Sequence, residues 1–215
     1  MTAPPVCFLK GTSIRTPSGD RAVEAVEIGD LVTTRSGAAK PIKWIGRQRY
    51  TSWLRRWPMM VCPVLIKRNA FGFDVPARDL FVSPGHAFLI GGVLVTARLL
   101  VNGKTIVSVR PGGTTIEYFN IELDAHDVIF AEGAPAETYF DCGNRETFDN
   151  FGEYYRVYGD APVKPDWCAP HIAEEGRIEW PATATANGLR STEHAGAVLA
   201  RIRGRLAARA LMLMG

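Results

Sequence analysis

The sequence lacks the cysteine pairs that mark a disulfide scaffold or a zinc knuckle. It contains no Cys-x-x-Cys motif, and its cysteines stand far apart, at Cys7, Cys62, Cys142 and Cys168. This spacing indicates a reduced protein without disulfides, and Cys62 is interpreted as a small buried hydrophobic residue. Cys168 and His171 have the spacing of a metal-ligand pair, but no second pair matches them, so we predict neither a metal nor a cofactor.

Long apolar runs and a strong charge of one sign are missing as well. No run approaches the ~18 apolar residues that a membrane-spanning helix needs. The net charge of +3 is too small to indicate a nucleic-acid partner. The first residues, Met1 to Val6, have neither a basic nor an apolar signal region. We therefore expect no secretory signal and a cytoplasmic location, with secretion by another route left open.

Short strand patterns are abundant. The 215 residues, 47% hydrophobic and 22% charged, are typical of a soluble globular protein with one domain and an appendage. β-Branched and aromatic residues alternate with polar ones between turn residues, and no long stripe of period 3.6 occurs before residue 140. The Gly91-Gly92 pair predicts a tight hairpin. The pattern predicts an all-β domain with strands at 13–16, 21–28, 31–34, 41–46, 79–82, 87–90, 93–96, 115–123 and 126–131.

The composition changes after residue 140. Residues 141–188 are rich in aromatic, proline and acidic residues without clear periodicity, which predicts an irregular extension. Within 189–215, apolar residues recur at helical spacing between arginines, which predicts an amphipathic helix that starts near 191–193. Its apolar positions are Ala195, Val198, Leu199, Ile202, Leu206 and Leu213. We expect this helix to pack on the domain or on a partner, in preference to lying on an anionic membrane.

Three clusters carry groups suited to an attack on the chain's own backbone. Cys7 follows a peptide carbonyl near the start of the chain, Ser83-Pro84-Gly85-His86 comes later, and Asp124-Ala125-His126 later still. A thiol with a pKa near ~8.5 is mostly protonated at neutral pH, so a nearby carboxylate or imidazole must take its proton. The amide nitrogen that leaves the tetrahedral intermediate needs a proton from a positioned histidine. These residue types predict self-directed acyl chemistry.

Each of these residues also has an ordinary structural interpretation. Cys7 is open to being a buried apolar residue and His86 a core histidine, while Ser83 and Asp124 are residue types that favour turns. The strand pattern and the order of the three clusters favour the catalytic interpretation.

Taken in order, the clusters resemble the sequence blocks of the Hint superfamily, which comprises inteins and the hedgehog autoprocessing domain. The serine of Ser83-Pro84-Gly85-His86 stands where the family's Thr-x-x-His block has threonine. The match covers roughly residues 6–140 and is most similar to the bacterial stand-alone branch. The matching segments are residues 7–14 with 23–34, 78–86, 118–126 and 130–137.

The resemblance implies a horseshoe-like all-β fold and an N-to-S acyl shift. Cys7 would attack the carbonyl of the preceding residue to form a thioester, and His86 would protonate the departing amine. Ser83 would hold or polarise the peptide, Asp124 would assist the thiol by proton transfer, and His126 would lie beside it.

The chain departs from the family's splicing members at their C-terminal end. Those members finish in His-Asn before Cys, Ser or Thr, whereas residues 134–138 read Ala-Pro-Ala-Glu-Thr and the chain continues. We therefore expect cleavage without splicing, with the upstream flank 1–6 as substrate and water or an external thiol as the resolving nucleophile. The expected organisation is the flank, a Hint domain at 7–140, the extension at 141–188 and the helix at 189–215. The alternative is a catalytically idle Hint-fold domain that serves as a binding or structural module.

Overall fold

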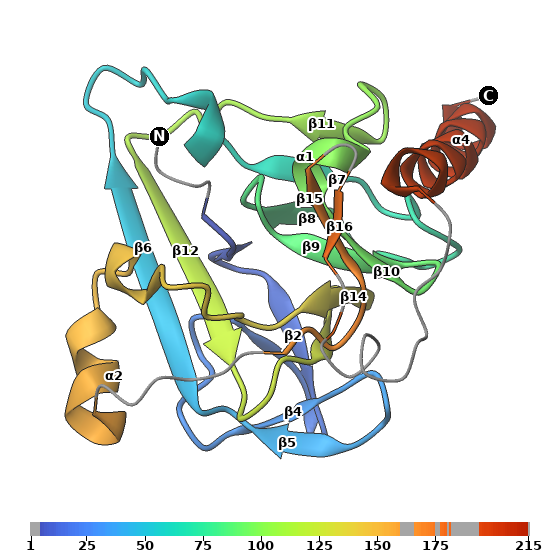
Figure 1. Cartoon of the computed structure of the whole chain (residues 1–215). Coiled ribbons are helices and arrows are strands. Elements are labelled where there is room, and N and C mark those ends of the chain that lie inside the picture. Colours follow the sequence, from blue (N-terminus) through green and yellow to red (C-terminus); the bar gives the residue numbers. More distant parts are fainter. Residues whose placement is uncertain (1–4, 160–165, 175–176, 180, 182–193, 215) are drawn as a thin grey trace.

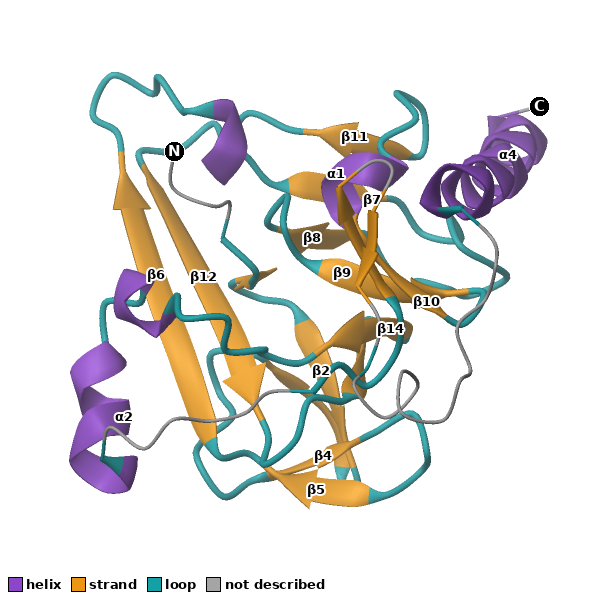
Figure 2. Cartoon of the chain, viewed as in Figure 1, coloured by secondary structure: helices purple, strands orange, loops and turns teal. Residues whose placement is uncertain are grey.

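The computed structural model describes residues 5–159, 166–174, 177–179, 181 and 194–214, and most of its regular structure is β-strand (Figures 1 and 2). The strands are β1 (Phe8–Leu9), β2 (Ser13–Thr16), β3 (Gly19–Ala22), β4 (Leu31–Thr33), β5 (Ala39–Pro41), β6 (Trp44–Thr51), β7 (Val64–Ile66), β8 (Leu80–Val82), β9 (Ala87–Ile90), β10 (Val93–Thr96), β11 (Ile106–Ser108), β12 (Thr115–Glu122), β13 (Val128–Ala131), β14 (Ala134–Glu137), β15 (His171–Glu174) and β16 (Arg177–Glu179). The helices are η1 (Met59–Val61), α1 (Ala97–Leu100), η2 (Arg145–Thr147), α2 (Phe151–Tyr158) and α4 (Ala195–Met214).

The described strands form two large sheets and a small one. The six-stranded sheet has the order β11-β7-β8-β1-β12-β6, the eight-stranded sheet has the order β16-β15-β10-β9-β14-β13-β2-β3, and β4 pairs with β5. The longest pairing joins β12 to β6 in antiparallel register from Thr115↔Thr51 to Glu122↔Trp44. These two strands form the long ribbon seen on one side of the molecule in Figure 1. The predicted all-β fold class is confirmed.

Turn chemistry explains two of the hairpins. Gly91 and Gly92 both have positive φ, at 63° and 85°, as the two central residues of a type I′ hairpin turn require. They join β9 to β10 as predicted. The turn between β13 and β14 instead places Glu132 at φ 48° before Gly133. The Glu132 carboxylate accepts the Ser13 N–H across 2.7 Å and pairs with Arg78 at 2.9 Å, and these contacts hold a residue type that rarely adopts this conformation.

The predicted strand at 21–28 ends early, at Ala22. The Ala25 N–H bonds to the Ala22 carbonyl across 2.8 Å, which turns the chain. The turn buries both Val23 and Val26, whose spacing of three does not fit a strand, and it leaves Ile28 half exposed. The alternation that predicted a longer strand therefore continued into a turn.

The extension is more regular than its composition predicts. It contains η2, α2 and the strands β15 and β16, which add to the edge of the eight-stranded sheet. β15 lies parallel to β10, with Leu94↔His171 and Val95↔Ile172 in register, and it buries Ile172 completely. Strands of three or four residues are too short to show a period in the sequence.

The C-terminal helix α4 packs on the domain through the predicted stripe. Val198, Leu199, Ile202 and Leu206 are buried in the main hydrophobic cluster. Leu213, predicted on the same stripe, is 42% exposed. The predicted start near 191–193 falls outside the described residues. Among the described helices, none is both long enough and apolar enough to cross a membrane.

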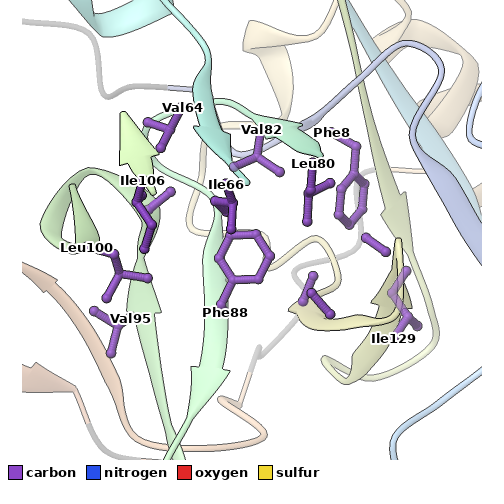
Figure 3. Packing of buried hydrophobic residues seen from close by; sticks show 14 of the residues in the cluster. Phe8, Val64, Ile66, Leu80, Val82, Phe88, Val95, Leu100, Ile106 and Ile129 are labelled. Carbon is purple, nitrogen blue, oxygen red and sulfur yellow. The ribbon is translucent and has the colours of Figure 1, made fainter. Parts of the chain in front are cut away.

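The first strand lies inside the core although it is only two residues long. The Phe8 side chain is fully buried in the main cluster with Leu80 and Val82 of β8 (Figure 3). Burial of a phenylalanine side chain contributes about 1.5–3 kcal/mol. This packing fixes the position of the chain that precedes β1.

Candidate active site

The register of β1 places Cys7 between two polar residues. Phe8 pairs with Val82 of β8 on one side and with Phe119 of β12 on the other, both in antiparallel register. The residue before Phe8 therefore lies beside the residue after each partner. Those residues are Ser83 and Asn120.

Two side chains hold the Val6–Cys7 peptide at both of its polar atoms. The Cys7 N–H donates to Ser83 Oγ across 2.7 Å, and Asn120 Nδ2 donates a short hydrogen bond to the Val6 carbonyl oxygen. The Ser83 hydroxyl also lies 2.6 Å from the Pro5 carbonyl oxygen, to which it donates. A peptide held in this way is both positioned and polarised, because Asn120 donates to the atom that becomes negative when the carbonyl carbon is attacked.

The Cys7 thiol is buried beside a glutamine. Its Sγ donates to Gln48 Oε1 across 3.5 Å, and the Gln48 amide in turn donates to the Thr147 carbonyl at 2.9 Å and hydroxyl at 3.0 Å. Burial raises the pKa of the Cys7 thiol well above its ordinary value, and a backbone hydrogen bond at Val6 offsets only part of this rise. The resting thiol is therefore protonated at neutral pH.

The extension supports Gln48 through a buried ion pair. Arg145 of η2 is 2% exposed, and its Nη2 lies 3.2 Å from Glu122 Oε1 and 2.9 Å from Asp141 Oδ2. Its guanidinium stacks on Tyr154 of α2, 3.4 Å from the ring centroid. These contacts fix η2, which ends at Thr147, against the domain, so a segment outside the predicted domain orients a neighbour of the thiol.

His86 lies in the turn after Ser83 and is fully buried. Its N–H bonds to the Ser83 carbonyl, and its ring packs on Phe8 with centroids 4.2 Å apart. Neither ring nitrogen has a hydrogen-bond partner among the described residues. Burial, against the opposing charge of Glu137 and with a smaller contribution from His126, lowers the pKa of His86 to about 4. His86 is thus a neutral imidazole at neutral pH, free to accept or donate a proton.

Glu137 is a buried carboxylate that faces histidines. Its Oε1 accepts the Ala87 N–H across 2.7 Å, and its Oε2 lies 3.6 Å from His126 Nε2. Burial raises the pKa of Glu137, but its interactions with the neighbouring rings of His126, His171 and His86 outweigh burial and lower it overall. His126 Nδ1 accepts the Cys168 N–H across 3.1 Å, so the ring proton of neutral His126 is on Nε2, toward Glu137.

Asp124 lies outside this buried cluster. It is an exposed residue beyond the end of β12, four residues along the chain from Asn120, and the structure describes no hydrogen bond between it and the Cys7 thiol. The structure brings Ser83 to the Val6–Cys7 peptide, and it brings His126 to Glu137.

Three polar residues of the site were missed from the sequence: Gln48, Asn120 and Glu137. Each occupies an inward-facing position of a strand. Asn120 follows Ile116 and Tyr118 in the buried phase of β12, and Gln48 follows Trp44 in the buried phase of β6. A polar residue in the apolar phase of an alternating strand is the signal that could have found Asn120 and Gln48, because buried polar groups need partners. Glu137 lies in the opposite phase from Ala134 and Ala136 of β14, so this signal does not reveal it.

Comparison with known proteins supplies the family. A family model described as Hint domain matches residues 6–143, which is more than half of the chain. This chain belongs to the Hint family. No protein of curated function matches it.

Solved Hint-fold structures are similar at low sequence identity. A bacterial intein-like domain from Clostridium thermocellum is 13% identical, with a TM-score of 0.37, over 63% of this chain and 99% of that chain. A DnaB intein from Synechocystis sp. PCC 6803 is 12% identical, with a TM-score of 0.43, over 62% of this chain and 98% of that chain. The family match ends at residue 143, so most of the extension and the helix α4 lie beyond it. Among the described residues, no group of three or more acidic, histidine or cysteine side chains is arranged to hold a metal ion.

Proposed function

We propose that this Hint domain processes itself at the Val6–Cys7 bond by an N-to-S acyl shift and that cleavage follows without splicing. One observation carries the proposal: Ser83 and Asn120 bind the two polar atoms of that peptide beside a buried thiol. The substrate is the domain's own upstream segment, and water or an external thiol resolves the thioester.

The first step transfers the thiol proton and forms the tetrahedral intermediate. Because the pKa of Cys7 is raised, the thiol needs a base, and the neutral imidazole of His86 is suited to accept its proton. Cys7 Sγ then bonds to the Val6 carbonyl carbon, and the negative charge develops on the oxygen to which Asn120 donates. A single donor of this kind contributes about 10²–10³-fold to a rate.

The second step breaks the carbon–nitrogen bond. The imidazolium of His86 returns the proton to the departing nitrogen, which becomes the free α-amine of Cys7, while the acyl group stays on sulfur as a thioester. The charge of Glu137 favours the protonated form of His86 at this point, and His126 positions that carboxylate. Asp124, which the resemblance placed beside the thiol, has no part in these steps.

The absence of a terminal asparagine dictates the outcome. Splicing needs an asparagine that cyclises and a downstream acyl acceptor, and Glu137-Thr138 supplies neither. The Thr138 hydroxyl is unactivated and far less nucleophilic than a thiolate. Glu137 is also engaged with Ala87 and His126 inside the fold, so this position has a different role here.

A reporter fusion tests the proposal. A reporter protein placed before Val6 is expected to be released when a thiol is added, leaving a product that begins at Cys7 and is intact at its C-terminus. Intact-mass spectrometry of the incubated fusion measures both products. A species in which the reporter is joined to a segment beginning near Tyr139, with residues 7–138 excised, would refute cleavage without splicing. A fusion that stays whole under every thiol would favour the idle-domain alternative.

Asn120→Ala in the same fusion is expected to slow release by ~10²–10³-fold, because the intermediate loses its oxyanion donor. The rate is measured by quenched time points, with the thermal unfolding midpoint of each variant as the folding control. Asn120 also accepts the Ile121 N–H through its own Oδ1, so some loss of stability is expected. Unchanged release in a folded Asn120→Ala variant contradicts the role of Asn120.

A further inference from the structure

A cavity of about 280 Å³ lies against Val6, the residue that would carry the acyl group. Most of its wall comes from segments beyond the predicted domain, including Trp167, whose ring stacks on Phe140 at the end of that domain with centroids 3.6 Å apart. Cys7, Ser83 and His86 are themselves fully buried. The cavity therefore offers an external molecule a path to the acyl carbon that avoids the buried thiol.

His171 of β15 stands in this wall without a hydrogen-bond partner. Its residue is 6% exposed, its ring stacks on Trp167 with centroids 4.2 Å apart, and its Nδ1 lies 4.0 Å from Glu179 Oε2. Neither ring nitrogen makes a hydrogen bond to any described residue. Burial lowers the pKa of His171, against the opposing charges of Glu137 and Glu179, so the ring is neutral and able to accept a proton at neutral pH.

The cavity is negatively charged. Glu137, Glu174 and Glu179 line it together with one basic residue, Arg98, so three negative charges against one positive leave a net charge of −2. Arg98 is also engaged, because its Nη2 donates to the Ala173 carbonyl across 2.6 Å. A cavity with this negative charge disfavours an anionic ligand and attracts a cationic ligand.

We infer that this cavity binds the external acyl acceptor, a small positively charged thiol, and that His171 is the general base of the resolving step. This inference rests on the proposed acyl shift. His171 takes the proton of the incoming thiol, the thiolate sulfur bonds to the Val6 carbonyl carbon, and the bond from that carbon to Cys7 Sγ breaks. The imidazolium then gives its proton to the departing Cys7 thiolate, so the products are a new thioester on the segment upstream of Cys7 and a domain with a free Cys7.

The charge preference is tested with three small thiols on the reporter fusion: cysteamine, 2-mercaptoethanol and 2-mercaptoethanesulfonate. Each release rate is divided by the rate at which the same thiol reacts with a free peptide thioester. This division corrects for differences in the intrinsic nucleophilicity of the three thiols. The corrected rates are expected to fall from the cationic to the neutral to the anionic thiol, with ~tenfold or more between the extremes. Glu174→Gln, which removes one charge and leaves His171 in place, is expected to narrow that range. Equal corrected rates for the three thiols overturn the inference.

The base is tested with His171→Gln. Thiol-dependent release is expected to slow by ~10²-fold. Hydroxylamine is a small neutral nucleophile that is already unprotonated at neutral pH. It is expected to cleave His171→Gln and the unmodified fusion at rates within about threefold. Such cleavage also shows that the variant is folded and forms the thioester. Equal thiol rates in the two proteins overturn the role of His171 and leave the acyl shift standing. Failure of the unmodified fusion with hydroxylamine and with all thiols contradicts the acyl shift itself.

Cys142 lines the same cavity, so its thiol is the internal alternative to an external acceptor. If Cys142→Ala loses release and the reporter is found attached to Cys142 in the unmodified protein, the acyl acceptor is the internal Cys142 thiol and the inference of an external acceptor is overturned.

Discussion

Replacing Cys7 with alanine is expected to abolish release of an upstream reporter. The thioester needs a sulfur bonded to the Val6 carbonyl carbon. Cys7 supplies both the amide nitrogen that leaves this carbon and the thiol sulfur that replaces the nitrogen. A methyl group in its place has no nucleophilic atom, so the loss is complete rather than partial. Electrophoresis of the fusion after incubation with a thiol measures it.

Cys62→Ala is the matched control. Cys62 is fully buried in the same hydrophobic cluster as Cys7, and its pKa is also raised, chiefly by burial. The substitution removes the same atom from the same cluster, so it carries a similar cost in packing, but it leaves the Val6–Cys7 bond untouched. Release from Cys62→Ala is expected to persist. Release that persists in Cys7→Ala would mean that another group cleaves the chain.

The sequence predicted the residues next to the Val6–Cys7 peptide better than the polar residues that surround it. Cys7 and Ser83 come from motifs whose order along the chain is visible, and β1 then brings them together through its pairing with β8. Asn120 faces the same bond through the pairing of β1 with β12, and a two-residue strand leaves no periodic signal from which its register could be predicted. Asp124, to which the resemblance assigns proton transfer, is exposed and lies four residues past the position opposite Cys7.

The extension was harder to predict because its contribution is tertiary. Thr147 orients Gln48 only when Arg145 is buried against Glu122, and no local pattern reveals an ion pair between residues so far apart in sequence. His171 reaches the cavity because β15 adds to β10 in parallel, and such a pairing across a long connection has no turn signature. Composition alone therefore does not predict short strands that form only by pairing with the edge of an existing sheet.

The second large effect is expected at His86. His86→Ala is expected to slow release by ~10²–10⁴-fold, the contribution of a positioned acid or base, because the thiol loses its proton acceptor and the amine its donor. His194→Ala, immediately before α4, is the control, since the exposed His194 lies outside the site and its replacement should leave the rate unchanged. Quenched time courses of the reporter fusion compare the three proteins. Equal rates for His86→Ala and the unmodified fusion contradict the role.

The pKa of His86 also predicts how stability depends on pH. Its folded value of about 4 lies below the ~6.5 of an unfolded histidine, so between these pH values the unfolded chain binds more protons. The free energy of unfolding therefore rises with pH across this window, by up to ~3 kcal/mol from this residue, and falls as the pH is lowered from 6.5 toward 4. His171, whose pKa is lowered by burial, adds a change of the same sign.

Denaturant unfolding of His86→Gln tests this pH dependence. The free energy of unfolding of His86→Gln is expected to differ less between pH 4.5 and pH 7 than that of the unmodified protein, because glutamine fills the site without titrating. An equal difference in both proteins would show that His86 is protonated in the folded state as readily as in the unfolded one, which contradicts the lowered pKa of the buried ring.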